Sequence, residues 1–370
     1  MQREESPAMA TGLERIAAKA RCEPKLRFTS LAHHITKERV WENLCQIRTS
    51  SAPGVDGQTV PGRGAHQALA TLHEVIAGRK VEWILEADLK NFFGSLSHEW
   101  MLRFVEHRVG DPRLISLIRR WLKANVLEDE ELHPSEEGTP QGGSISVLLS
   151  NLYLHYVLDL WFERVVKPRL RGEAYLVRYI DDFVLCFQYR ADALRVQEVL
   201  RKRLGKFGLT LAEAKTKLAE FGRYAQRHAS KRGRRRPETI YFLGFTLYCT
   251  RNQKGNFRVG LLTEKTRLRR ALTHLQDQMR RMRHEPIPEQ VQHLNQMLRG
   301  HYAYYGVAGN IPGLQRVHRA VERFWRRMLS SRSWKGEIWW KQFHRIKERF
   351  PLLRPKLYLP YAGLQAIAVL

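Results

Sequence analysis

Cysteine is scarce in this sequence, and long apolar runs are absent. Only four of the 370 residues are cysteine and none forms a Cys-x-x-Cys pair, which argues against a disulfide scaffold or a structural zinc site. No run of about 18 apolar residues occurs, and the N-terminal stretch contains no apolar signal core. We therefore expect a protein without membrane spans that works in the cytoplasm.

Two common nucleotide-binding signatures are also missing. The glycine-rich stretch 138–143 (GTPQGG) precedes a predicted helix over residues 145–166, and a loop in that position can hold an anion on its free N–H groups. It lacks the Lys-Ser/Thr ending of a P-loop and the GxGxxG of a dinucleotide fold. These two nucleotide-binding classes are thereby disfavoured.

Acidic residues are few relative to basic ones. The 37 Asp and Glu stand against 63 Lys and Arg, which leaves a net charge of +26 and predicts a polyanionic partner, either nucleic acid or a membrane surface. From residue 263 onward, predicted helices place arginines beside aromatic residues, as in Arg323, Arg326 and Arg327 around positions 324–325. This composition is typical of surfaces that hold a sugar-phosphate backbone, so we favour nucleic acid.

Three aspartates stand where strands are expected to end. Apolar runs on both sides of Tyr179-Ile-Asp-Asp182 predict a hairpin with Asp181 and Asp182 at its tip, although an Asp pair is also common in plain polar turns. Residues 81–88 alternate like a strand, with Asp88 at its end. Its core face is expected to carry Val81, Trp83, Leu85 and Ala87.

The remaining patterns predict mostly helices. Residues 65–77 read as a helix, and Ser97 and Asp111 are expected to cap the two helices that follow them. The basic run 223–236 is expected to be a loop that either is merely solvated or contacts nucleic acid.

Converging carboxylates have a definite chemical use. Aspartates from separate strands can hold two Mg²⁺ ions about 3.5–4 Å apart, which activate an attacking hydroxyl and stabilise a leaving pyrophosphate. Mg²⁺ prefers oxygen ligands and keeps several waters, so two or three Asp and the substrate phosphates suffice. Together with the basic helices, the residues indicate a nucleotidyltransferase that follows a template.

Several motifs occur in a telling order. They are Asp88-Leu-x-x-Phe-Phe93, Gly138-Thr-Pro-Gln-Gly-Gly143, Tyr179-Ile-Asp-Asp182, Lys215-Thr216, Phe242-Leu-Gly-Phe245 and Leu298-Arg-Gly-His-Tyr-x-Tyr-Tyr-Gly306. The set resembles reverse transcriptases, and more narrowly those of bacterial group II introns and their free-standing relatives, from about Arg27 to Tyr358. The resemblance implies an α+β fold, a right-hand polymerase palm with an antiparallel sheet and truncated fingers, followed by an all-α thumb (maturase X) domain.

The resemblance also implies roles for the acidic residues and their neighbours. Asp88 and Asp181 would be the principal metal ligands with Asp182 close by, and the backbone carbonyl of Leu89 would reach a metal. Lys215 would sit near the pyrophosphate as a proton donor.

Further implied roles concern the substrates. Phe93 would exclude the ribose 2′-hydroxyl and so favour dNTPs, while Gln141 and Gly142 would contact the incoming nucleotide. Leu243 and Gly244 would grip the primer end. The implied partners are an RNA template, a DNA primer and dNTPs, with two Mg²⁺ ions, Mn²⁺ as a substitute, and group II intron RNA as an alternative partner. The implied location is the bacterial cytoplasm or its nucleoid.

Three departures from the family pattern matter. Ile180 stands where intron-encoded members usually have Ala, and relatives with Ile resemble host-adopted enzymes, including some linked to DNA repair. Val147 stands where the family usually has Pro. The long fingers segment between the regions of Gly57 and Gly62 is missing. Two hypotheses follow, an active polymerase or a maturase-like RNA-binding protein with an idle site.

The expected domains follow the same resemblance. Residues 1–60 would form an N-terminal extension and the start of the fingers, residues 61–250 the palm with reduced fingers, and residues 251–370 the helical thumb.

Overall fold

The structure, a computed structural model, describes residues 64–123, 126–128, 131–133, 138, 144–332 and 336–369, and isolated positions between 16 and 31. The expected gap in the fingers, near residues 57–62, lies outside the described residues. The chain forms two compact units that are not continuous in sequence. The first includes residues 89–168 and 199–211, and the second includes residues 64–88, 169–198 and 212–369.

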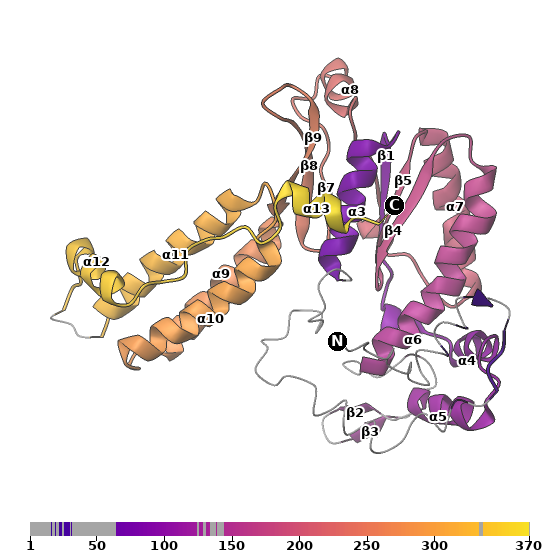
Figure 1. Ribbon diagram of the computed structural model, residues 1–370, viewed down its shortest axis with the longest axis horizontal. Coiled ribbons are helices and arrows are strands. Elements are labelled where there is room, and N and C mark those ends of the chain that lie inside the picture. The colour runs from indigo at the N-terminus through magenta and orange to yellow at the C-terminus, as the bar shows by residue number, and fades with distance from the viewer. Residues whose placement is uncertain are drawn as a thin grey trace, which may run out of the picture. The chain divides into compact units, whose positions relative to one another are not determined.

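A four-stranded antiparallel sheet organises the second unit (Figure 1). Its order is β4 (Ala174–Tyr179), β5 (Asp182–Phe187), β1 (Trp83–Ala87) and β6 (Lys217–Glu220). Helix α3 (Ala65–Gly78) contacts β4, and its apolar side chains share a core with Ile84 of β1. The helix predicted over residues 65–77 is confirmed.

Strand β1 is buried on both faces, which corrects the prediction of a single core face. Ile84 and Leu85 are fully buried although they point to opposite sides, and Glu86 is buried as well. A central strand covered on both sides reads as a continuous apolar run rather than an alternating one.

A second antiparallel sheet follows in the chain, formed by β7 (Ile240–Phe242), β8 (Phe245–Arg251) and β9 (Phe257–Thr263). Strands β7 and β8 are joined by a two-residue turn at Leu243 and Gly244. The basic run 223–236, predicted as a loop, instead contains helix α8 (Ala225–Lys231). Ala225 and Ala229, one helical turn apart, are both buried, and this small apolar face holds the helix in place.

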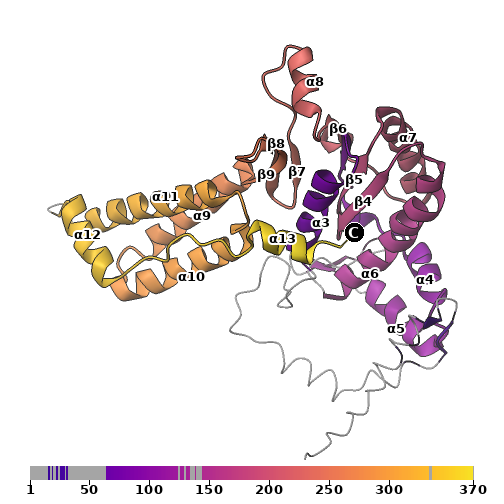
Figure 2. The same ribbon diagram turned by 45° about the horizontal axis from the view of Figure 1, so that its top comes forward.

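The C-terminal part of the second unit is helical (Figure 2). Helices α9 (Lys265–Arg281), α10 (Ile287–Tyr305), α11 (Ile311–Ser330) and α12 (Trp340–Arg349) enclose a core around Trp325. Helix α13 (Tyr361–Ile367) packs against α3. No helix among the described residues is long and apolar enough to cross a membrane.

The first unit contains α4 (His98–Glu106), α5 (Pro112–Leu122), the hairpin β2 (Val126–Glu128) and β3 (Glu131–His133), and α6 (Ser144–Leu154). The predicted caps are confirmed: Ser97 accepts a hydrogen bond from Trp100 N and Asp111 accepts one from Arg113 N. The helix predicted over residues 145–166 changes form after α6 into two π-helical segments, His155–Asp159 and Phe162–Val166. Helix α7 (Arg190–Lys206) includes residues of both units.

Candidate active site

Three aspartates meet at one edge of the four-stranded sheet. Strand β1 ends at Ala87, which pairs with Phe183 of β5, so the next positions along the two strands are Asp88 and Asp182. Asp181 precedes β5 in the turn from β4. Because neighbouring antiparallel strands hold opposite residues about 4.5–5.5 Å apart, the register brings Asp88 and Asp182 together, and the turn places Asp181 beside them.

The turn that carries Asp181 is tight. Only Ile180 and Asp181 lie between the paired residues Tyr179 and Asp182, and Ile180 has a φ of 57°. In a two-residue hairpin turn whose first central residue has a positive φ, that first position is ordinarily a glycine. A branched residue in this conformation is strained, and Arg178 supports the turn by donating from Nη1 to Ile180 O at 2.8 Å.

The three carboxylates repel one another electrostatically. The pKa of Asp182 is raised to about 6, first by loss of solvation and then by the charges of Asp181 and Asp88, while Arg267 and Lys215 act in the opposite direction. Loss of solvation and the charge of Asp88 also raise the pKa of Asp181. The Asp182 side chain keeps contact with solvent, which screens part of this repulsion. The edge thus has an excess of negative charge that a cation would relieve.

Lys215 already supplies one positive charge. Its Nζ lies 2.5 Å from Asp88 Oδ2, and this hydrogen bond raises the pKa of Lys215. The backbone reinforces the placement, because Ala212 N donates to Asp88 O at 2.8 Å. Lys215 ends a short 3₁₀ turn, Glu213–Lys215, just before β6.

The donor set suits Mg²⁺ by its chemistry, since carboxylate oxygens are the ligands this ion prefers. In the part of the chain that the structure describes, no group of three or more His, Cys, Asp or Glu side chains already stands at metal-holding spacing. Asp88 is instead engaged by Lys215. Metal binding by the Leu89 carbonyl stays a prediction. Leu89 itself is buried and forms an isolated antiparallel β-bridge with Leu211.

The predicted nucleotide-contacting residues belong to the first unit or lie outside the described residues. Phe93 is in the 3₁₀ turn Phe92–Ser95, with its ring edge-on to Phe92. Gly138 has a φ of 88°, and a Cβ there would lie 2.7 Å from Phe93 O, so this approach requires glycine. Gln141 and Gly142 lie outside the described residues.

The hairpin predicted to grip the primer end is held by the helical region. Leu243 and Gly244, with φ values of 51° and 74°, form the two-residue turn between β7 and β8, as in a type I′ turn. Tyr304 Oη donates to Leu243 O at 3.0 Å, and Glu264 N donates to Gly244 O at 2.9 Å. Primer contact at this turn stays a prediction.

The three arginines predicted to bind nucleic acid differ in their surroundings. On α11, Arg323 and Arg327 are exposed. Arg326 is half-buried, donates from Nη1 to Ile338 O at 2.8 Å, and stacks on Trp340. Arg326 therefore stabilises the fold, and the exposed pair is better placed to meet a phosphate backbone.

Two residues near the aspartates were missed by the sequence reasoning. Glu86 was assigned to the face away from the core, yet it is buried, accepts a hydrogen bond from Tyr241 N at 2.5 Å, and has its pKa raised to about 7, mainly by burial. Arg267, on α9, is close enough to lower the pKa of Asp182. The apolar Ile84 on the same face was a signal for the burial of Glu86. No local signal pointed to Arg267.

Comparison with known proteins gives a family match. Residues 24–247 match the family model described as reverse transcriptase (RNA-dependent DNA polymerase). Over 119 residues the chain is 37% identical to the group II intron-encoded protein LtrA of Lactococcus lactis subsp. cremoris, covering 30% of this chain and 20% of that protein. Over 229 residues it is 26% identical to protein YkfC of Escherichia coli, covering 54% of this chain and 56% of that protein.

The matched relatives are only partly covered. The chain aligns with a fifth of the first protein and just over half of the second. Among solved structures, apo telomerase from Candida tropicalis superposes with a TM-score of 0.44 at 11% identity, covering 78% of this chain and 46% of that one. The four residues of the acidic edge, Asp88, Asp181, Asp182 and Lys215, all lie inside the family match.

Proposed function

Because this chain belongs to the reverse transcriptase family, we propose that it is an RNA-directed DNA polymerase of the group II intron type, which extends a primer with dNTPs. The observation that carries the proposal is the meeting of Asp88, Asp181 and Asp182 at one sheet edge, where the charge of Asp88 raises the pKa of both other carboxyls and the charge of Asp181 raises that of Asp182. Cations nearby stabilise such an edge by offsetting this repulsion. Nucleotidyl transfer needs a cation-binding edge of this kind.

Each polar residue of the edge has a proposed task. Asp88, Asp181 and Asp182 would hold two Mg²⁺ ions, with the Leu89 carbonyl as a further ligand, and these ions supply charge that stabilises the reacting phosphates. Lys215 carries its proton on Nζ at hydrogen-bond distance from Asp88 and would donate it toward the leaving pyrophosphate. Phe93, Gln141 and Gly142 would position the nucleotide.

The helical region would hold the primer-template. Leu243 and Gly244 present a tight turn anchored to the helices, and Arg323 and Arg327 offer exposed charges for phosphates. We also propose that the palm domain extends to about residue 250 and that the helical thumb domain follows it. Strand β9 reaches Thr263, so the first thumb helix begins at Lys265.

One observation favours a second candidate function. The carboxylate of Asp88 is engaged by Lys215, and the described acidic groups do not already stand at metal-holding spacing. A chain with this arrangement at rest could serve as a maturase-like protein that binds structured RNA, such as group II intron RNA, through its basic helices. In that case the aspartates would be dispensable.

Primer extension separates the two functions. The purified chain is given dNTPs, Mg²⁺ and a primer annealed to an RNA or a DNA template. Asp181→Ala should reduce extension at least about 100-fold, since it removes a charge that acts on the reacting groups. The control is Asp277→Ala, which removes an exposed carboxylate of α9 that is paired only with Arg280 among the described residues. Asp277→Ala should extend normally.

The outcomes point in different directions. Extension that is lost in Asp181→Ala and kept in Asp277→Ala supports the polymerase, and the ratio between RNA and DNA templates separates retrotransposition from DNA repair. No extension by the unmodified chain, with tight RNA binding retained, contradicts the polymerase and supports the maturase-like function.

A further inference from the structure

A second basic site lies at the far end of the four-stranded sheet from the aspartates. A cavity of about 320 Å³ opens between the start of β1, the end of β6, the start of α7 and the segment around α8. We call it the arginine pocket, and its lining includes Trp83, Arg190, Arg232, Arg234 and Arg236. Pockets that hold a small ligand start at about 300 Å³, so it has room for one nucleotide unit.

The acids of the arginine pocket are already neutralised. Glu220 contacts His228 Nδ1 at 2.6 Å and Arg232 Nη1 at 2.8 Å. Glu238 contacts Arg234 Nη1 at 3.1 Å and Lys217 Nζ at 3.9 Å. Arg232, Arg234 and Lys217 already balance the two carboxylates, so further arginines give the pocket a surplus of positive charge.

Arg190 and Arg236 are the arginines that remain available. Both are exposed, and within the described part of the chain neither has an acidic partner. The Arg190 guanidinium lies 5.5 Å from the centre of the Trp83 ring, which is half-buried beside it. A cationic group held next to an indole is the combination that takes a phosphate and stacks a base.

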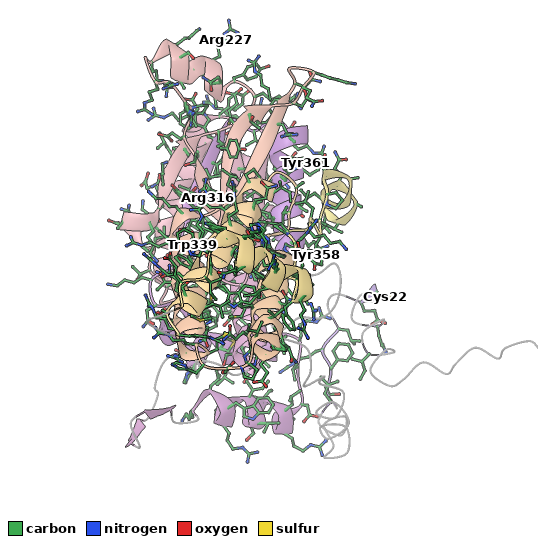
Figure 3. All side chains as sticks on the ribbon, turned by 90° about the vertical axis from the view of Figure 1, so that its left-hand side faces the viewer. Cys22, Arg227, Arg316, Trp339, Tyr358 and Tyr361 are labelled. Atoms are coloured by element: carbon green, nitrogen blue, oxygen red, sulfur yellow. The ribbon has the colours of Figure 1, made fainter. Side chains whose placement is uncertain are left out.

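Positive charge continues from the arginine pocket along helix α8. Helix α8 and its flanks carry Arg223, Arg227, Lys231 and Arg235 in addition to the pocket arginines, without any acid between residues 223 and 236. Figure 3 shows Arg227 on α8, well separated from Arg316 and Trp339 of the C-terminal helical region. A long basic path favours a polymer over a small free anion.

The pocket is too distant to be part of the acidic edge. Trp83 begins β1 and Asp88 follows its last residue, and five strand residues at about 3.3 Å each place them about 16 Å apart. A hollow for one base beside an aromatic ring suits an unstacked strand, because bases inside a duplex are not free to enter it.

We propose that the arginine pocket binds one nucleotide of a single-stranded nucleic acid whose backbone continues along α8. Arg190 and Arg236 contact phosphates of this strand and Trp83 lies against its base. The site is separate from the acidic edge and does not depend on polymerase activity. It therefore gives the protein a second binding site for template or partner RNA.

Fluorescence anisotropy tests this assignment with a labelled oligouridine of about 12 nucleotides and its DNA counterpart. The test variant is Arg190→Gln with Arg236→Gln. The matched control, Arg120→Gln with Arg164→Gln, removes the same charge from exposed arginines of the first unit. Each lost phosphate contact lowers the slope of log affinity against log salt by about 0.7, so two should weaken binding about 25-fold near 0.1 M salt and far less near 1 M.

Three results would overturn the assignment. The first is that the test variant binds the oligomer as tightly as the unmodified chain. The second is that the control substitutions weaken binding as much as the test substitutions do. The third is that a free mononucleotide displaces the labelled oligomer as well as unlabelled oligomer does, which would indicate a site for free nucleotides. The two proposals are tested independently. The variant Arg190→Gln with Arg236→Gln should still extend a short primer-template, and Asp181→Ala should still bind the single-stranded oligomer with full affinity.

Discussion

Protonation of His301 is expected to weaken the fold at acid pH. This residue lies on α10, where its ring packs against Tyr305 with the ring centres 4.8 Å apart. Its Nε2 is buried and has no hydrogen-bond partner among the described residues. Burial lowers the pKa of His301 from 6.5 to about 4, because the charged ring would lose its solvation.

The sign and size of the effect follow from this pKa. Above pH 6.5 the ring is neutral in the folded and in the unfolded chain, so pH has no effect through this residue. As the pH falls from 6.5 toward about 4, the unfolded chain takes up a proton that the folded chain refuses, and folding becomes less favourable. At about 1.4 kcal/mol per pH unit, the loss in the free energy of unfolding amounts to about 3 kcal/mol.

Urea denaturation across this pH range measures the loss directly. In His301→Phe no proton can be taken up at this position, so the difference in free energy between variant and unmodified chain should grow as the pH falls. The control is His284→Phe, which makes the same change at an exposed position. If unmodified chain and His301→Phe lose stability in parallel, burial of His301 does not resist its protonation and the reasoning is wrong.

Three further predictions concern the turn between β7 and β8 and the C-terminal helices α10 and α11. Arg326→Gln should lower the free energy of unfolding by about 1–2 kcal/mol, because its guanidinium hydrogen-bonds to a main-chain carbonyl, whereas the exposed Arg323→Gln should not; equal urea midpoints would contradict this. Tyr304→Phe should cost about 1 kcal/mol in thermal unfolding through loss of its bond to Leu243 O, and an unchanged melting temperature would count against that bond. Gly244→Ala should cost about 1–2 kcal/mol, because its φ of 74° disfavours any side chain; stabilisation on urea denaturation would refute it.

Local patterns were enough for most elements of the fold. The helix over residues 65–77, the hairpin around Tyr179 to Asp182 and the caps at Ser97 and Asp111 were foreseen, because spacing and capping chemistry act within a few residues. The motif order was also sufficient for the family, which the match over residues 24–247 confirms. The α+β fold with its antiparallel palm sheet is confirmed as well.

The burial of individual side chains could not be inferred from local sequence patterns. Helix α8 was missed because a basic run predicts solvation, while the burial of Ala225 and Ala229 depends on what they pack against. Glu86 and Arg326 read as ordinary exposed charges, yet the first is buried in a central strand and the second is half-buried against an indole. Burial is a property of neighbours distant in the chain, which a single sequence does not specify.

The sequence by itself determined the identity of the acidic residues and the strong positive charge, since composition and motif order need no coordinates. Only the tertiary structure decided that Asp88 meets Asp182 across β1 and β5, that Lys215 neutralises Asp88, and that Arg190 lies beside Trp83. The physical reason is that each of these contacts joins segments about 90 to 130 residues apart. Strand register and the packing of a shared core bring such segments together, and both arise from the sum of many weak contacts over the whole unit.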